Sequence, residues 1–382
     1  MILNAQAQSA VTMKTEKMHA VYLKGHGGFE QLEYTDQAPK PIPKPDEVLV
    51  RVLACGMNNT DINTRTGWYN PSVKSGTADW TDAGVETGSN RMGGWSGDIK
   101  FPRIQGMDVA GVIEAVGDGI GPERVGQRVV CDPYLHSPGS ENVLDSLGLL
   151  GAEFDGGFAQ YLCLPAANAL PVTQECRLKD SQLSTLPCSG GTAMNMLLLA
   201  RVGRGDRLLV TGASGGVGSF LVQIGNLLGA EVMAVAAREK HAQLAGLGAS
   251  DTIDRHAGNL TAAALSAGSG GGYSVVADVV GGDAFPAYLD MLNRGGRYVV
   301  AGAIAGPMVQ LDLRTLYLKN LSFFGSTIYS RKTMLRLMEF ANGNQLVPAV
   351  HREYDLRDIG EAQKFFLKKK HVGNLVLIPP SG

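Results

Sequence analysis

The segment Leu208-Leu-Val-Thr-Gly212-Ala-Ser-Gly215-Gly216-Val-Gly218 is the most informative part of this sequence about its fold. An apolar run leads into the glycines, and apolar residues recur after them at the spacing of one helix face. Strand, glycine-rich turn and helix in this order are the context that a dinucleotide-binding turn requires, although an empty turn is the alternative. Glycine lets the backbone approach a pyrophosphate closely, and the free N–H groups at the helix start attract its charge. We predict that a dinucleotide is held here by Ser214, Gly215, Gly216, Val217 and Gly218.

The chain around this turn alternates between short apolar runs and helical stretches. The apolar runs lie at residues 207–211, 231–236, 274–279 and 297–301. Such alternation is typical of a parallel sheet with helices on both faces. The sequence therefore predicts an α/β protein whose residues 171–343 form a Rossmann domain with a doubly wound parallel sheet.

The rest of the chain has a different character. Residues 18–170 contain short alternating runs separated by glycine and proline turns, and residues 344–382 return to strand-like runs. We expect these two parts to form one β-rich domain into which the nucleotide domain is inserted. Residues 1–17 are polar and we expect a flexible tail. Residues 70–100 carry two tryptophans and no periodic pattern, so we predict a flap or wall over the active-site cleft, with an oligomer contact as the alternative.

Composition excludes several classes of function. Lys and Arg number 34 against 36 Asp and Glu, so a net charge of −2 argues against nucleic acid as a partner. No apolar run approaches the roughly 20 residues of a membrane helix. The 5 cysteines are far apart, which argues against a disulfide framework and favours the reducing cytoplasm. A small-molecule substrate is the expected partner.

The end of the second predicted strand indicates which nicotinamide cofactor binds. An NAD site places an acidic residue there to hold the ribose 2′-hydroxyl. The sequence instead reads Ala236-Ala237-Arg238-Glu239-Lys240. Arg238 can hold a 2′-phosphate through its guanidinium group, and Lys240 adds a second cation. We predict NADPH, with a solvated Arg238 that is cancelled by Glu239 as the alternative.

Five stretches carry a family resemblance, and together they span about His19 to Pro379. They read GMNNTDINTRTGWY, IQGMDVAGVIEAVG, PCSGGTAMNML, VTGASGGVG and DLRTLYLKNLSFFGS. The chain resembles the medium-chain dehydrogenase/reductase superfamily, within its quinone oxidoreductase (zeta-crystallin-like) branch. The resemblance implies a GroES-like β domain beside the Rossmann domain, with the active site in the cleft between them. It also implies a homodimer or homotetramer, for which residues 321–325 are the candidate edge strand.

The resemblance locates the catalytic zinc site of other members and shows that its ligands have changed. Zinc members use Cys, His and Cys, and these positions hold Asn58, Met107 and Cys188 here. One thiol with an amide and a thioether is a poor zinc site, because Zn²⁺ takes three or four Cys, His or acidic ligands. We therefore expect no metal.

The same resemblance suggests roles for the residues of the cleft. Asn58 is implied as the active-site asparagine and Tyr69 as a pocket tyrosine, whereas Asn63 replaces a second pocket tyrosine. We expect Asn58 and Tyr69 to be catalytic, with a turn residue and a packing residue as the respective alternatives. We expect Asn63 and Met107 to line the substrate pocket, and Thr192, Gly302 and Asn374 to contact the cofactor.

The expected reaction follows from the loss of the metal. Without a strong Lewis acid, hydride transfer suits acceptors that delocalise the charge themselves. We predict an NADPH-dependent oxidoreductase that reduces quinones or α,β-unsaturated carbonyl compounds. A zinc-free alcohol or aldehyde dehydrogenase and a crystallin-like NADPH-binding protein with little turnover are the alternatives.

Overall fold

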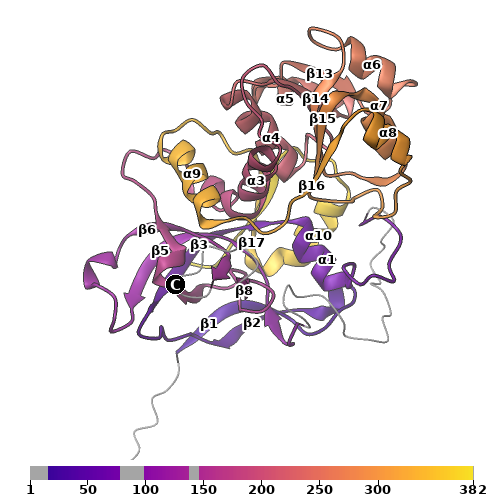
Figure 1. Ribbon diagram of the computed structural model, residues 1–382. Helices are drawn as coiled ribbons and strands as arrows, with labels where there is room; N and C mark the ends of the chain where they lie inside the picture. Colours follow the sequence, from indigo (N-terminus) through magenta and orange to yellow (C-terminus); the bar gives the residue numbers. More distant parts are fainter. Residues whose placement is uncertain (1–15, 78–98, 137–145, 382) are drawn as a thin grey trace, which may run out of the picture.

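The computed structural model describes residues 16–77, 99–136 and 146–381. In Figure 1 a helix-covered sheet domain lies above a β-rich domain, with α1 and α10 near their boundary. The predicted α/β class is therefore confirmed, with a parallel sheet in one domain and a GroES-like β domain as the other.

The parallel sheet has six strands in the order β13-β12-β11-β14-β15-β16. The direction of the strand order changes between β11 and β14, and in such sheets ligands bind outside the carboxyl ends of the strands at this point. The candidate edge strand β16 does lie at the edge of the sheet, while the oligomer stays a prediction. The strands are β11 (Arg207–Val210), β12 (Glu231–Ala236), β13 (Asp251–Asp254), β14 (Tyr273–Asp278), β15 (Leu292–Val300) and β16 (Ser322–Gly325).

Helices cover both faces of this sheet because its strands are apolar on both sides. Leu208 and Val210 belong to one buried core together with residues of α3, α4 and α9. Leu209, which lies between them in the strand, belongs to another core with residues of α6 and α7. The helices are α3 (Gly191–Leu199), α4 (Gly216–Leu227), α5 (His241–Gly246), α6 (Leu260–Ser266), α7 (Phe285–Met291), α8 (Leu313–Leu318) and α9 (Arg331–Asn342).

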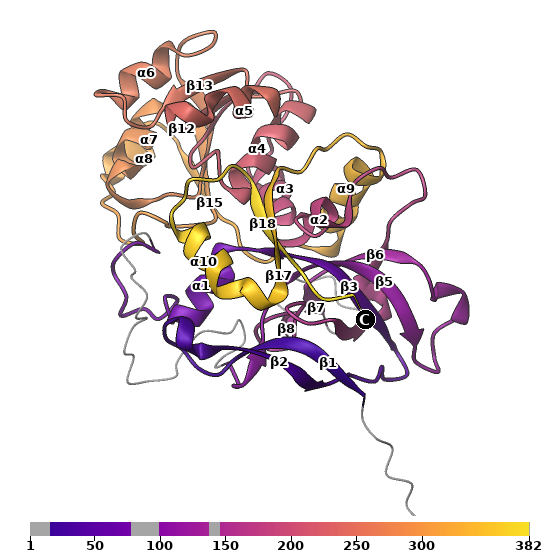
Figure 2. The same cartoon turned by 180° about the vertical axis from the view of Figure 1, so that it is seen from behind.

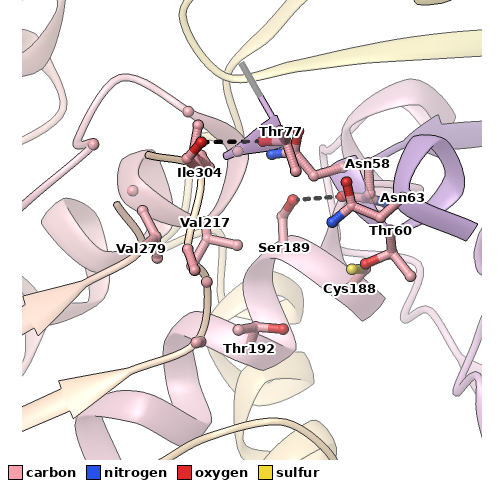
Figure 3. A pocket seen from close by; sticks show the side chains of 18 of the residues that line it. Asn58, Thr60, Asn63, Thr77, Cys188, Ser189, Thr192, Val217, Val279 and Ile304 are labelled. Carbon is pink, nitrogen blue, oxygen red and sulfur yellow. Dashed lines mark hydrogen bonds between the residues drawn. The ribbon is translucent and has the colours of Figure 1, made fainter. Parts of the chain in front are cut away.

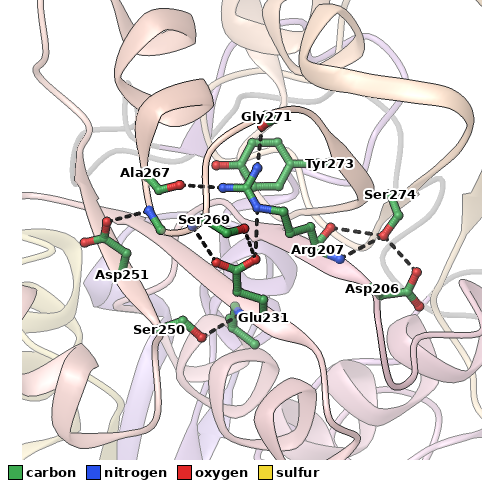
Figure 4. A network of polar contacts seen from close by, with 12 residues as sticks. Asp206, Arg207, Glu231, Ser250, Asp251, Ala267, Ser269, Gly271, Tyr273 and Ser274 are labelled. Carbon is green, nitrogen blue, oxygen red and sulfur yellow. Dashed lines mark hydrogen bonds and ion pairs between the residues drawn. The ribbon is translucent and has the colours of Figure 1, made fainter.

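A polar network ties together the amino ends of the strands (Figure 4). Arg207 Nε donates to Glu231 Oε2 at 3.0 Å, and Glu231 also accepts from the backbone and hydroxyl of Ser269. Ser274 Oγ donates to Asp206 Oδ1 at 2.8 Å. The charged groups of this network are paired with one another at the amino ends of the strands. They therefore stabilise the sheet at the end opposite to the one where a ligand is expected.

The β-rich domain contains a seven-stranded sheet and a three-stranded sheet. The path of the larger sheet is β10-β6-β5-β3-β18-β17, with β9 also paired to β3, and the smaller sheet is β2-β1-β4. The last strand, β18, pairs with β3 and sets Leu375 opposite Met57. The C-terminal segment therefore belongs to the sheet of the β-rich domain, as Figure 2 also shows. The elements are β1 (Lys17–Leu23), β2 (Leu32–Pro39), β3 (Glu47–Met57), α1 (Asn59–Thr66), β4 (Arg103–Ile104), β5 (Asp108–Val116), β6 (Arg128–Cys131), β7 (Tyr134–His136), β8 (Ser146–Leu149), β9 (Tyr161–Pro165), β10 (Ala169–Pro171), α2 (Asp180–Leu183), β17 (Val350–Asp355), α10 (Ile359–Leu367) and β18 (Asn374–Ile378).

Two sequence predictions fall largely outside the described residues. The tail lies outside them except for its last two residues, and residues 78–98 of the predicted flap lie outside them as well. The described start of the flap segment ends at Thr77, whose hydroxyl is 3.5 Å from the carbonyl oxygen of Ile304 in the parallel-sheet domain. Among the described residues, no helix is long and apolar enough to cross a membrane.

Candidate functional site

A pocket opens between the two domains at the carboxyl ends of β11 and β14 (Figure 3). One wall comes from the parallel-sheet domain and the other from the turn between β3 and α1. It is lined by Met57, Asn58, Asn59, Thr60, Asn63, Trp68, Tyr69, Thr77, Cys188, Ser189, Thr192, Gly212, Gly215, Gly216, Val217, Gly218, Val279, Ala301, Gly302, Ala303, Ile304, Phe366 and Asn374.

The glycine-rich turn forms one wall because side chains cannot be accommodated there. A Cβ on Gly218 would lie 2.3 Å from the carbonyl oxygen of Gly212, and one on Gly216 would lie 2.5 Å from Ser189 Oγ. Gly212 itself has φ of 56°, a conformation that favours glycine. The turn leads into α4, whose first N–H groups have no partner within the helix. Backbone donors and open space therefore meet where a pyrophosphate is expected.

The other residues predicted to bind the cofactor fall into two groups. Thr192, Gly302 and Asn374 line the same pocket as the glycine turn. Ser214 does not line the pocket, and its hydroxyl accepts a hydrogen bond from Lys240 at 3.2 Å.

Lys240 has a different environment from the one expected for a phosphate ligand. Its ammonium group donates to Ser214 Oγ and to the carbonyl oxygens of Lys369 at 2.8 Å and His371 at 2.9 Å. Burial and the nearby Arg255 lower its pKa. Three acceptors use its three N–H groups, so Lys240 fastens the glycine turn to the returning C-terminal segment.

Arg238 lies where the sequence predicts it, but beside a carboxylate that the prediction missed. Its side chain is 84% exposed, and its Nε lies 3.4 Å from Asp254 Oδ2. Asp254 ends β13, where its backbone pairs with Ala236. A hydrogen bond from the backbone of His256 and the charge of Arg238 lower the pKa of Asp254. Because β12 and β13 are parallel neighbours, their carboxyl ends lie side by side, and this relation could have predicted an acid from β13 next to Arg238.

Asn58 is held by hydrogen bonds on both sides of its amide group. Its Nδ2 donates to Asp108 Oδ2 at 2.7 Å, and its Oδ1 accepts from Ser189 Oγ at 3.0 Å. Its backbone N–H donates to Asp61 Oδ2 at the start of α1. Asn58 was predicted to be catalytic, whereas the structure directs its amide nitrogen to Asp108. Asp108 and Ser189 were missed because they follow Asn58 by 50 and 131 positions.

Asp108 is fully buried beside a second acid. Its Oδ1 accepts from the backbone N–H of Cys188, and its Oδ2 accepts from Asn58. Burial raises the pKa of Asp108 to about 8, and the charge of Asp61 adds to the effect. Burial likewise raises the pKa of Asp61 to about 7. Near neutral pH both carboxyl groups are therefore poised between their neutral and ionised forms.

Uncharged polar groups line the part of the pocket near Asn58. Tyr69 is 41% exposed as a residue, but it lines the pocket, its hydroxyl lies 3.5 Å from Thr60 Oγ1, and burial of that hydroxyl raises its pKa. Asn63 Oδ1 is buried and has no hydrogen-bond partner in the described part of the chain. Burial raises the pKa of Cys188, which stays a thiol and lies beside Thr60 in Figure 3. Hydroxyl and amide groups are thus the donors available to a substrate.

The residues at the former zinc positions do not form a metal site. Met107 is only 3% exposed, packs in the hydrophobic core and does not line the pocket, which differs from its predicted place at the substrate. Asn58 is engaged by Asp108 and Ser189, so Cys188 is the remaining soft ligand. Within residues 16–77, 99–136 and 146–381 there is no group of three His, Cys, Asp or Glu able to hold a metal ion. This donor set does not fit zinc.

Comparisons with known proteins agree with this architecture. The family of alcohol dehydrogenase GroES-like domains matches residues 44–174, and the family of zinc-binding dehydrogenases matches residues 216–343. An NAD-dependent alcohol dehydrogenase of Sulfurisphaera tokodaii is 27% identical over 90% of this chain and 96% of its own length. An acryloyl-coenzyme A reductase of the same organism is 27% identical over 95% of this chain and all of its own length.

A solved structure is more similar still. A crystal structure from Sinorhizobium meliloti 1021 that bears the name of an alcohol dehydrogenase has a TM-score of 0.86 and 41% sequence identity. The match covers 96% of this chain and 97% of the other. With both domains matched and one relative similar over nearly the whole length, this chain belongs to the medium-chain dehydrogenase/reductase superfamily of oxidoreductases.

Proposed function

We propose that this oxidoreductase reduces quinones or α,β-unsaturated carbonyl compounds with NADPH and without zinc. The observation that carries the proposal is the uncharged polar wall formed by Tyr69, Thr60 and Asn63 opposite the glycine turn. When bound, NADPH supplies a hydride. The residues of this chain hold the cofactor, orient the acceptor and stabilise the charge that develops on its oxygen.

The chemistry of this wall suits a conjugated acceptor. A neutral hydroxyl or amide is a weaker electrophile than a metal ion, so it stabilises a spread charge better than it activates an isolated ketone. In an enone or quinone the charge spreads into an enolate or a hydroquinone. Tyr69 is the best-placed donor, because the amide nitrogen of Asn58 is directed to Asp108.

The choice of NADPH rests on Arg238. Its exposed guanidinium lies at the end of β12, where an adenosine ribose is expected in this fold. The two residues before it are alanines, so no acid at the carboxyl end of β12 competes with a phosphate. Asp254 is the acid that favours NADH, and the ion pair with Arg238 reduces its influence.

The names of the relatives support both the proposal and its alternative. A reductase of acryloyl-coenzyme A acts on a conjugated double bond, which is the chemistry proposed here. The alcohol dehydrogenase names favour interconversion of an alcohol and an aldehyde or ketone. Binding of NADPH without turnover would match the third alternative, a crystallin-like protein.

A matched pair of substrates tests the proposal. We expect oxidation of NADPH with 2-cyclohexen-1-one or 1,4-naphthoquinone, and little with cyclohexanone, which has the same ring and an isolated carbonyl. The experiment follows NADPH absorbance and includes an aldehyde and a chelator. Turnover only with the aldehyde or cyclohexanone, or activity lost to the chelator, contradicts the proposal.

A further inference from the structure

A buried carboxylate lies behind the pocket wall at the carboxyl end of β14. Asp278 is the last residue of this strand and is 0% exposed. The next residue, Val279, lines the pocket and is labelled in Figure 3. Ala301 also lines the pocket, and its backbone N–H donates to the carbonyl oxygen of Asp278 at 3.1 Å. Asp278 is therefore a direct neighbour of two residues that form the wall.

The side chain of Asp278 accepts hydrogen bonds from four residues. The hydroxyl groups of Thr211 and Tyr298 donate to Oδ1 and Oδ2, respectively. The backbone N–H of Val280 donates to Oδ1 at 2.8 Å, and that of Gly281 lies 3.2 Å from Oδ1 and 3.1 Å from Oδ2. A proton on either oxygen would face one of these donors. The arrangement therefore holds Asp278 in its ionised form.

The charge of Asp278 is not balanced by a cation of this chain within the residues that the structure describes. The arginines of the neighbouring strands, Arg207 and Arg297, pair with acids at the amino ends of the strands instead. Buried charges are normally paired, because their field is weakly screened in the interior. The hydrogen bonds stabilise the carboxylate, but its negative potential still reaches the adjacent pocket.

The position of Asp278 corresponds to the nicotinamide half of the expected cofactor. In this fold the end of β12 is expected to hold the adenosine ribose, and the glycine turn after β11 the pyrophosphate. In the strand order β13-β12-β11-β14-β15-β16 the rest of the dinucleotide then lies over β14 and β15. The nicotinamide ring is therefore expected beside the wall that Val279 and Ala301 form, with Asp278 behind it.

We propose that the negative charge of Asp278 favours the oxidised, cationic nicotinamide ring over the reduced, neutral ring. This inference rests on the proposed binding of a nicotinamide cofactor in this pocket. The two forms of the cofactor carry the same phosphates and differ by one positive charge on the ring. Asp278 attracts that charge, so it stabilises the oxidised form more than the reduced form. Transfer of the hydride to the acceptor leaves the charge on the ring, and solvent supplies the proton that completes the reduction. Asp278 therefore favours reduction of the substrate.

The hydrogen bonds of Asp278 also give it a structural role, which differs from the effect of its charge. Thr211 precedes Gly212 of the glycine turn, and Gly281 belongs to the loop after β14. A displaced turn weakens the binding of both forms of the cofactor. Loss of the charge weakens the oxidised form alone, so the ratio of the two affinities separates the two roles.

The variant Asp278→Asn removes the charge and keeps the shape of the side chain. Its oxygen can accept from Thr211 and the backbone N–H groups, and its nitrogen can donate to the Tyr298 oxygen. Dissociation constants of NADP⁺ and NADPH are measured by calorimetry at one neutral pH. We expect the ratio of Kd for NADP⁺ to Kd for NADPH to rise roughly tenfold, as for unit charges about 10 Å apart at an effective dielectric of about 20. An unchanged or lower ratio would overturn the inference.

Tyr298→Phe is the matched control, because it removes one hydrogen bond of Asp278 and keeps the charge. The ratio of the two dissociation constants should not rise in this variant, even where both affinities fall. An equal rise in Tyr298→Phe and Asp278→Asn would assign the effect to the position of the loops and contradict a role of the charge.

A cofactor analogue tests the charge in the wild type, where no variant has to fold. In this analogue of NADP⁺ a benzamide replaces the nicotinamide, so the ring keeps nearly the same shape and loses its charge. Wild type should bind NADP⁺ roughly tenfold more tightly than the analogue, and Asp278→Asn should remove most of this preference. Equal wild-type affinities, or a preference that survives in Asp278→Asn, contradict the inference. Failure of the wild type to bind NADPH or NADH overturns the proposed function itself.

Discussion

The two ends of the pocket are built in different ways. At the cofactor end the wall is main chain, in the turn of Gly215, Gly216 and Gly218 at the start of α4. At the substrate end the wall is made of side chains, among which Asn58 depends on Asp108 and Ser189 for its orientation. A local stretch of sequence determines the first wall, whereas residues far apart in the chain determine the second.

This difference explains where function can change within the fold. A main-chain site tolerates little variation where an added Cβ would collide with backbone, as it would at Gly218. A side-chain site is less constrained by the backbone, and Met107, for example, packs in the hydrophobic core. The cofactor end therefore identifies the superfamily, and the substrate end sets the reaction.

The largest effect is expected at the substrate end, from Tyr69→Phe. This change removes one hydroxyl from the pocket and keeps the ring. If the hydroxyl stabilises the developing charge, turnover with an enone should fall by about 10²–10³-fold. Steady-state kinetics with 2-cyclohexen-1-one measure it.

Two controls accompany the Tyr69 variant. Tyr317→Phe changes a tyrosine that is 61% exposed and far from the pocket wall, and it should have no effect. The NADPH dissociation constant should be unchanged in both variants. If Tyr69→Phe kept the wild-type turnover, the Tyr69 hydroxyl would have no role in the reaction. Thr60 or Asn63 would then be favoured as the hydrogen-bond donor to the substrate oxygen.

At the cofactor end Gly218→Ala should weaken cofactor binding by about tenfold or more, since displaced backbone N–H groups lose charge-assisted hydrogen bonds to the pyrophosphate. The new Cβ would lie 2.3 Å from the Gly212 oxygen and 2.6 Å from the Ala213 Cα, so the turn itself must move. Gly246→Ala is the matched control, because a Cβ there meets nothing within 4 Å. Equal affinities of the two variants would show that the turn does not hold the cofactor.

The sequence was informative about these two ends to different extents. The turn, the helix after it and the parallel sheet follow from local spacing, and the fold class was confirmed on that basis. The partners of Asn58 and Lys240 could not be read in this way, because the pairing of β3 with β5 brings Asp108 close to Asn58, and the packing of the C-terminal segment brings Lys369 close to Lys240. The Asp254 acid was missed for a related reason, since it lies on the neighbouring strand and not on β12.

Cofactor preference is expected to change by a smaller factor. Arg238→Ala should weaken NADPH by roughly 10-fold or somewhat more and leave NADH nearly unchanged, because a charge-assisted hydrogen bond to the 2′-phosphate is lost. Asp254→Asn should instead strengthen the binding of NADPH, since it removes the negative charge 3.4 Å from Arg238 Nε. Titrations of both cofactors measure these shifts. Equal losses of NADPH and NADH in Arg238→Ala would show that Arg238 does not contact the phosphate.

The smallest effect concerns the stability of the substrate end. Because burial raises the pKa of Asp108 to about 8, the folded chain holds a proton there that the unfolded chain releases near its ordinary pKa of about 3.9. Between these values the folded state binds more protons, so the contribution of Asp108 to stability falls as pH rises from about 4 to about 8 and is constant above.

Comparison with Asp108→Asn isolates this contribution. Burial lowers the pKa of His371 to about 4 and of Lys369 to about 7, and these groups change stability with pH in the opposite direction. Both are present in the two proteins, so they cancel in the difference between the urea unfolding free energies. We expect wild type to lose stability steadily relative to Asp108→Asn across the window, because between the two pKa values each rise in pH favours the unfolded, ionised form. A difference that stays constant or grows with pH would mean that Asp108 is ionised throughout.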